Sequence, residues 1–174
     1  MVQSRKVHPL VWMAIGLVAG VSIGGFCPHS PLHATATDRY ETFAMATGFV
    51  DDGIEAIYFL DFLTGDLRAA VLSKQMPMQF NAFFQRNILT DLGVDPSKNP
   101  RYLMVTGMSD VPRGGTQTRL SSSVVYVAEI TTGQVAAYAI PWNSARHSSG
   151  QLTNGALMLV AGTRFRTAAV RDQK

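Results

Sequence analysis

Cysteine is nearly absent from this chain: among its 174 residues, only residue 27 is a cysteine. A single cysteine excludes an internal disulfide framework, because each bridge needs two. Since Cys27 lies near the amino end, the rest of the chain also lacks the thiol of a cysteine nucleophile. Any chemistry in the body of the chain would therefore depend on other side chains.

Histidine is almost as scarce. Beyond residue 37 the sequence contains only His147, within the polar segment Asn143-Ser-Ala-Arg-His-Ser-Ser-Gly150, which predicts an exposed loop. General base catalysis needs an imidazole held by partner groups, and a lone loop histidine does not supply them. The sequence also contains no His-Glu-x-x-His, Gly-x-Ser-x-Gly, P-loop or Rossmann glycine motif. We therefore predict no catalytic or cofactor-binding residues, and a role other than catalysis is favoured.

One set of metal-ligand types occurs, in the segment after the apolar amino-terminal run. Cys27, His29 and His33 have side chains that suit zinc or haem iron. However, Pro28 and Pro31 break the helix that would place the two histidines on one face. No fourth ligand is evident nearby, so we predict no metal site.

Acidic residues are missing from the first 37 positions, and the formal net charge is +3. Arg5 and Lys6 supply two of these charges, which leaves the body at about +1 (3 − 2 = 1). A body so close to neutral is unlike a nucleic-acid-binding protein, so nucleic acid is not an expected partner.

Charge is also absent from residues 9–27, directly after these two basic residues. The run is long enough for the ~17–25 residues that cross a bilayer, and basic residues before it favour a cytoplasmic amino end. We therefore predict a cytoplasmic region 1–8, a transmembrane helix or signal anchor 9–27, a neck 28–37 and an extracytoplasmic, periplasmic-type domain 38–174. The alternative is a signal peptide cleaved after Ala34-Thr35-Ala36, but the apolar run is longer than the usual ~7–15 residues.

Three small residues recur within the predicted span. Gly16, Gly20 and Gly24 are four positions apart and fall on one stripe of a helix. Such stripes let two membrane helices approach closely, so self-association through them is one expectation. The alternative is that these glycines are incidental, since glycine is common in membrane helices.

The body contains two similar sequence blocks in the same order. Phe43-Ala-Met-Ala-Thr-Gly48 resembles Tyr102-Leu-Met-Val-Thr-Gly107, and Ile57 to Ala69 resembles Val125 to Ala137. Each second block has alternating apolar residues around a Thr-Gly turn, which is typical of a β-hairpin. We predict an internal duplication with repeats 42–72 and 101–140 and a partial third copy at 156–166. The expected fold is mainly β, an antiparallel meander of about seven strands.

Between the repeats the periodicity changes. Phe80, Phe83, Phe84, Ile88 and Leu92 follow a helical spacing. Pro77 precedes this stripe and Gly93 follows it, as at helix ends. The pattern predicts one amphipathic helix that covers the sheet.

Two resemblances follow from these motifs. The hairpins, with an acid, a Thr-Gly turn and an apolar strand, resemble blades of quinoprotein-type β-propellers. The chain is too short for about 4–8 four-stranded blades and lacks the tryptophan usual after the turn, so no quinone site is implied. The whole chain resembles an uncharacterised bacterial family of small membrane-anchored β-rich proteins, on its apolar run, neck and repeated blocks. That resemblance implies membrane anchoring and a β-rich body, and no particular activity.

The candidate functional surface is formed by two loops: the loop of residues 110–120 between the blocks of the second repeat, and the loop that carries His147. The second repeat is longer between its two blocks: Gly107 to Tyr126 spans nineteen positions, against ten from Gly48 to Tyr58. Long polar insertions on a repeat scaffold often carry binding. We predict a membrane-tethered, extracytoplasmic binding or assembly module with a protein partner. The alternative is a small extracytoplasmic hydrolase that uses the loops of Asp51, Asp110 and His147.

Overall fold

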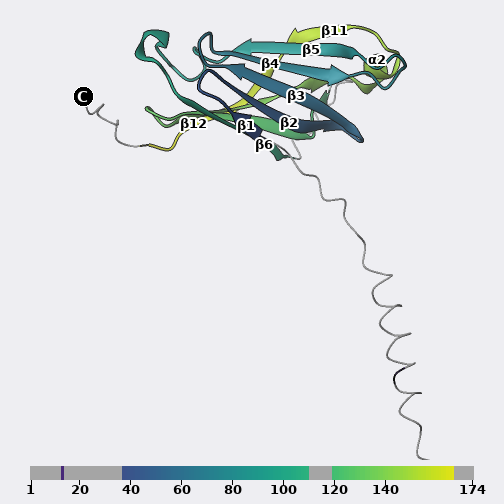
Figure 1. The fold of residues 1–174 in the computed structure, drawn as a ribbon, viewed down its shortest axis with the longest axis horizontal. Helices are drawn as coiled ribbons and strands as arrows, with labels where there is room; N and C mark the ends of the chain where they lie inside the picture. Colours follow the sequence, from purple (N-terminus) through teal and green to yellow (C-terminus); the bar gives the residue numbers. More distant parts are fainter. Residues whose placement is uncertain (1–12, 14–36, 110–118, 167–174) are drawn as a thin grey trace, which may run out of the picture. The chain divides into compact units, whose positions relative to one another are not determined.

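The structure is a computed structural model that describes Met13 and residues 37–109 and 119–166 (Figure 1). The chain divides into two compact units, Met1–Ala34 and Thr35–Lys174. Apart from Met13, the expected transmembrane run 9–27 lies outside the described residues, as do the glycine stripe and nearly all of the neck. Within the described part, no helix has the length and apolarity needed to cross a membrane.

The described body is mainly β and its sheets are antiparallel, as expected, with one parallel exception. The first sheet has the strand order β1-β2-β3-β4-β5-β11. Its strands are β1 (Thr37–Arg39), β2 (Phe43–Asp51), β3 (Ile54–Asp61), β4 (Asp66–Leu72), β5 (Phe80–Asn87) and β11 (Thr153–Ala156). Only β5 and β11 pair in parallel, and Figure 1 shows them side by side.

The second sheet has the order β12-β9-β8-β6, and a two-stranded ladder joins β7 to β10. Its strands are β6 (Tyr102–Met108), β8 (Ser123–Glu129), β9 (Gln134–Ala139) and β12 (Met158–Arg164). The remaining elements are β7 (Arg119–Leu120), β10 (Pro141–Trp142), the 3-10 helix η1 (Pro96–Lys98) and the helix α2 (Ser144–Ser148). The described residues thus contain twelve strands, more than the seven or so that the sequence suggested.

The two sheets contain the same four-stranded series. β2-β3-β4-β5 and β6-β8-β9-β12 each run antiparallel from one strand to its neighbour. The cross-strand registers are Ala46–Tyr58–Ala69 in the first sheet and Val105–Tyr126–Ala137 in the second. The predicted equivalence of Tyr58 and Tyr126 is therefore confirmed. The segment expected to open a third copy instead contains β12, which pairs with β9 as the fourth strand of the second sheet.

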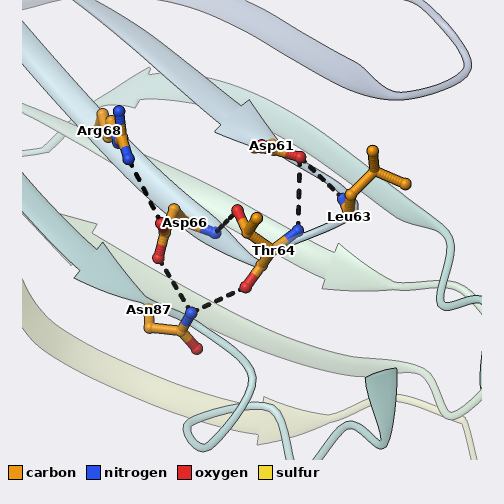
Figure 2. Close-up of polar contacts among 6 residues, drawn as sticks. All are labelled: Asp61, Leu63, Thr64, Asp66, Arg68 and Asn87. Atoms are coloured by element: carbon orange, nitrogen blue, oxygen red, sulfur yellow. Dashed lines mark hydrogen bonds and ion pairs between the residues drawn. The ribbon is translucent and has the colours of Figure 1, made fainter. Parts of the chain in front are cut away.

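The hairpin turns of the two series are also equivalent. Gly65 and Gly133 both have φ 69°, a conformation that glycine adopts without a Cβ clash. Each amide donates to the main-chain oxygen four residues earlier, at 2.9 Å, on Asp61 and Glu129 respectively. The side chains of these two acids also accept from backbone amides within their own turns. Figure 2 shows Asp61 accepting from the amides of Leu63 (2.8 Å) and Thr64 (3.4 Å).

The predicted covering helix is wrong, because most of that segment forms the strand β5. Aromatic residues are common in strands, and β5 lies between β4 and β11 in the first sheet. Adjacent residues of a strand point to opposite faces, so Phe84 is buried while Phe83 is 41% exposed. Ile88 and Leu92 are buried in the turn after the strand, where the Leu92 amide donates to the Ile88 carbonyl. The helical spacing thus came from a strand joined to a compact turn.

The core lies between the two sheets, and the equivalent strands bury opposite faces. We call the face that carries Met45 in the first sheet and Met104 in the second the Met face. The face that carries Tyr58 and Tyr126 is the Tyr face. Tyr58 is fully buried and Tyr126 is 38% exposed, while Met104 is 3% exposed and Met45 is only half-buried. The Tyr face of the first sheet therefore packs on the Met face of the second.

Direct contacts join these two faces. The Thr106 hydroxyl on β6 donates to the Thr47 carbonyl on β2 at 2.6 Å. A Cβ on Gly48 would lie 2.5 Å from the Ser123 Oγ, so β2 approaches β8 closely enough to require glycine there. One continuous core cluster includes buried residues from both sheets. The two series therefore form one packed body.

Candidate functional site

One group of polar side chains gathers where β2 ends. Asp51 forms an ion pair with Arg119 on β7, and its Oδ2 accepts a hydrogen bond from Trp142 Nε1 at 3.1 Å. Burial alone would raise the pKa of Asp51. Hydrogen bonds from the Asp52 amide, Arg119 and Trp142 outweigh that effect and hold the pKa below its usual value. Asp51 is therefore a carboxylate whose partners lie on β7 and β10.

His147 packs beside the same tryptophan. The expectation of an exposed loop is wrong: His147 lies in the short helix α2 and is 2% exposed, with its ring centroid 4.7 Å from that of Trp142. Burial lowers the pKa of the imidazole, and nearby Lys74 lowers it further, while Asp51 opposes them. Neither ring nitrogen has a hydrogen-bond partner among the described residues. The lowered pKa favours the neutral imidazole, and the described residues enclose the ring.

The structure thus brings two of the three predicted hydrolase residues to one end of the body. Asp51 and His147 both contact Trp142, but no hydrogen bond joins the acid to the imidazole. Asp110 lies outside the described residues. Sequence reasoning missed Trp142 and Arg119, which hold Asp51, because nothing in the local pattern links β7 and β10 to the end of β2. The arrangement ties three chain segments together, with the His147 side chain enclosed among the described residues.

The Met face of the first sheet is open and hollowed. A cavity of about 820 Å³ lies over β2, β3, β4 and β5, with β11 along one side. Met45, Ile57, Phe59 and Phe83 are among the residues that line it. Phe59 is 37% and Phe83 41% exposed, although both are large apolar side chains. Grouped exposed apolar residues of this kind mark interaction sites more often than single ones do.

The Tyr face of the second sheet is open in part. Leu103, Val105 and Tyr126 are 50%, 53% and 38% exposed. Beside them Val124, Ala137 and Ala139 are buried, with Leu120 of β7 packed on them. The paired residues of this face on β6, β8 and β9 carry no charge; they are Leu103, Val105, Gly107, Val124, Tyr126, Ala128, Val135, Ala137 and Ala139. An uncharged face is suited to contact with another apolar surface.

Both open faces had a signal in the sequence. Phe43-Ala-Met-Ala and Tyr102-Leu-Met-Val are apolar at every position, without the polar alternation of a strand that faces water on one side. Such continuous apolar runs predict strands buried on both faces. In the structure each sheet packs only one face on the other sheet. Among the described residues, the Met face of the first sheet stays open, and the Tyr face of the second is covered only in part, by Leu120.

No group of three or more metal-ligating side chains occurs among residues 37–109 and 119–166. The three residues weighed as metal ligands from the sequence, Cys27, His29 and His33, lie outside these ranges.

Comparison with known proteins gave no match to a protein-family model, to a curated protein or to a solved structure. The resemblances to propeller blades and to a membrane-anchored bacterial family therefore stay predictions.

Proposed function

We propose that this protein is a membrane-tethered extracytoplasmic assembly module, built from an internal duplication, whose body binds another protein through its open apolar sheet faces. The observation that carries the proposal is the hollow Met face of the first sheet, with Phe59 and Phe83 exposed over it. Burying a large apolar side chain is worth roughly 1.5–3 kcal/mol, so two uncovered phenylalanines favour a bound partner. The tether is proposed from the uncharged run 9–27 after Arg5 and Lys6.

The tether is tested by alkaline extraction of membranes that contain the full-length protein. A retained anchor keeps the body in the membrane pellet, and a protease added from the extracytoplasmic side digests it. Release of a soluble product that begins at Thr37 would show cleavage and remove the anchor from the proposal. Protection from the external protease would place the body in the cytoplasm and contradict the orientation.

The binding face is tested by a photoreactive amino acid placed at residue 83 of the full-length protein in its native membrane. We expect a crosslinked protein adduct, because the Phe83 side chain faces the hollow. The control carries the same probe at Lys98 on η1, whose side chain is 80% exposed and lies outside both faces. Equal adducts at the two positions, or none at either, would reject the Met face as a binding surface.

The alternative is a small hydrolase that uses the loops of Asp51, Asp110 and His147. The convergence of Asp51 and His147 on Trp142 is the observation in its favour. The burial of the imidazole opposes it, because a general base must reach the proton it removes. Hydrolysis of a panel of esters and amides that is lost on His147→Gln, in protein that remains folded, would favour the enzyme over the assembly module.

A further inference from the structure

Within one chain, the two sheets meet through a contact between unlike faces. The Tyr face of the first sheet covers the Met face of the second. The described residues therefore leave two faces over: the Met face of the first sheet, and the part of the second sheet's Tyr face that Leu120 does not cover. These are the same two kinds of face that already pack together inside the molecule.

The open Met face carries residues like those of the buried one. Equivalent pairs, first sheet then second, are Phe43 and Tyr102, Met45 and Met104, Thr47 and Thr106, Ile57 and Val125, and Phe59 and Val127. Every pair keeps its apolar or hydroxyl character. In the second sheet Tyr102, Met104, Val125 and Val127 are all buried. The first sheet thus presents to solvent a version of a surface that this protein already covers.

The open Tyr face corresponds to the buried one in the same way. Equivalent pairs are Ala46 and Val105, Gly48 and Gly107, Tyr58 and Tyr126, and Ala69 and Ala137. In the first sheet, a residue of the facing sheet, Ser123, fills the space beside Gly48 and Tyr58. Beside Gly107 the nearest described atom to an added Cβ is Tyr126 Cε2, at 3.4 Å. The notch that Ser123 fills in one sheet has no such occupant among the described residues in the other.

We propose that the partner is a second copy of this chain, docked head to tail, with the Met face of one copy's first sheet on the Tyr face of the next copy's second sheet. This inference rests on the proposed function and names its partner. The contact would repeat the one between the two sheets of each chain. Because it joins unlike faces, it leaves one free face at each end of a dimer, so further copies add until a ring closes or a filament forms.

The two faces differ in charge, and the docking brings two charged residues of the Met face, Arg68 and Glu55, against an uncharged surface. The open Tyr face is uncharged at its paired positions on β6, β8 and β9. On the open Met face Arg68 lies in the cavity lining, and its guanidinium is 3.5 Å from the Asp66 carboxylate in the same strand. This cation therefore has its own counter-ion. Glu55 stands where the second sheet has Ser123, so a contact that repeats the internal one would bring its side chain beside Gly107 of the next copy. Glu55 is exposed in the single chain, and its carboxylate would have to turn toward solvent in the assembly.

The test uses the full-length protein in mild detergent, with mass measured by native mass spectrometry across a range of concentrations. We expect wild type to form dimers and larger species. Phe59→Arg blocks the Met face and Val105→Arg blocks the Tyr face, and each alone should weaken association at least about tenfold, or 1.4 kcal/mol. Leu63→Arg makes the same change at an exposed turn position outside both faces and should leave association unchanged.

Mixing the two blocked variants gives the decisive result. The Phe59→Arg copy keeps its Tyr face and the Val105→Arg copy keeps its Met face, so the mixture should form a heterodimer and stop there. If like faces pair instead, the Val105→Arg variant alone would still dimerise through its Met faces, and the proposal is wrong. Association that survives both substitutions, such as one through the predicted membrane helix, would also overturn it.

A smaller substitution, Gly107→Val, tests the Tyr face with less risk of unfolding the protein than an arginine. Gly107→Val fills the open notch, and its Cβ meets only Tyr126 among the described atoms, at an ordinary contact distance. It should leave the melting temperature of the monomer nearly unchanged and still weaken association. If the purified protein stays monomeric while residue 83 crosslinks to a different protein in the membrane, self-assembly fails and the proposed function stands. If residue 83 captures nothing, both fail.

Discussion

The two four-stranded series have matching registers, matching turns and similar residues, yet they bury opposite faces. Tyr58 and Tyr126 occupy the same position in their sheets, and only Tyr58 is in the core. The strands cannot have selected the buried face by pattern alone, because both faces of each series are largely apolar. The choice is set by which sheet lies opposite. In this protein the pairing of strands fixes the register, and the packing of one sheet on the other then determines which face of each sheet is buried.

The largest expected difference between the two sheets lies at this tyrosine pair. Tyr58→Ala removes a fully buried aromatic side chain and should lower the free energy of unfolding by about 3–5 kcal/mol. Tyr126→Ala should cost less than about 1 kcal/mol, because its ring is partly exposed in the dilute monomer. Urea denaturation at low protein concentration measures both. Equal losses would mean that the two faces are covered alike and would remove the basis of the comparison.

A smaller difference is expected at the acids before the two turns. Glu129 is 2% exposed and accepts from the Thr131 amide (2.8 Å), the Thr132 amide (2.6 Å) and the Thr132 hydroxyl (2.7 Å). Glu129→Ala should cost about 2 kcal/mol, in the range for hydrogen bonds to charged groups. Asp61→Ala, in the more exposed turn, should cost less. Thermal unfolding of both variants at neutral pH checks the order, and a larger loss at Asp61 would contradict it.

The lowered pKa of Glu129 predicts how the stability of the fold depends on pH. Burial would raise the pKa of Glu129, but the hydrogen bonds from Thr132 and Thr131 outweigh it and lower the pKa below the usual 4.5. A depressed carboxyl pKa stabilises the fold above about pH 4.5, and this contribution is lost as the pH falls through the folded value. The stability gap between wild type and Glu129→Gln should therefore be constant near neutral pH and shrink in acid. A gap that widens in acid would mean that the folded pKa is raised.

The smallest expected effect lies at the glycines of the two turns. Both have φ 69°, so Gly65→Ala and Gly133→Ala share a strain of about 1 kcal/mol. At Gly65 the new Cβ would meet the Leu89 side chain, which can move. At Gly133 it would meet the backbone of Arg166, whose amide nitrogen is 2.9 Å away and cannot easily shift. Melting temperatures should therefore fall further for Gly133→Ala, and the reverse order would show that the two turns are not equivalent.

The register and the turns could be predicted from the sequence because they depend on local repetition. The Thr-Gly turns and the Tyr58 and Tyr126 positions follow from residue spacing alone, and the pairings confirm them. The strand β5 could not be told from a helix, since Phe80, Phe83 and Phe84 satisfy both periods until their neighbours are known. Its pairing with β11 joins Ala82 to Thr153, and no local signal links such distant segments.

The candidate site was predictable to a lesser degree. The sequence singled out Asp51 and His147, and the structure places both against Trp142. Their burial and their partners depend on how β7, β10 and α2 fold over the end of β2, which composition does not reveal. The open faces were present in the sequence as unbroken apolar runs, but which face would stay open depends on the packing of the two sheets.

The strand β11 has a consequence for biogenesis. It pairs with β5 as the last strand of the first sheet, yet it is made of residues 153–156, and β12 (158–164) pairs with β9 as the outer strand of the second sheet. Until these last strands emerge, β5 and β9 each expose an unpaired edge, which is a template for aggregation. In synthesis from the amino end, β5 and β9 emerge well before the strands that pair with them, β11 and β12. The exposed edges of β5 and β9 are therefore most open to pairing with other chains before residues 153–164 have emerged.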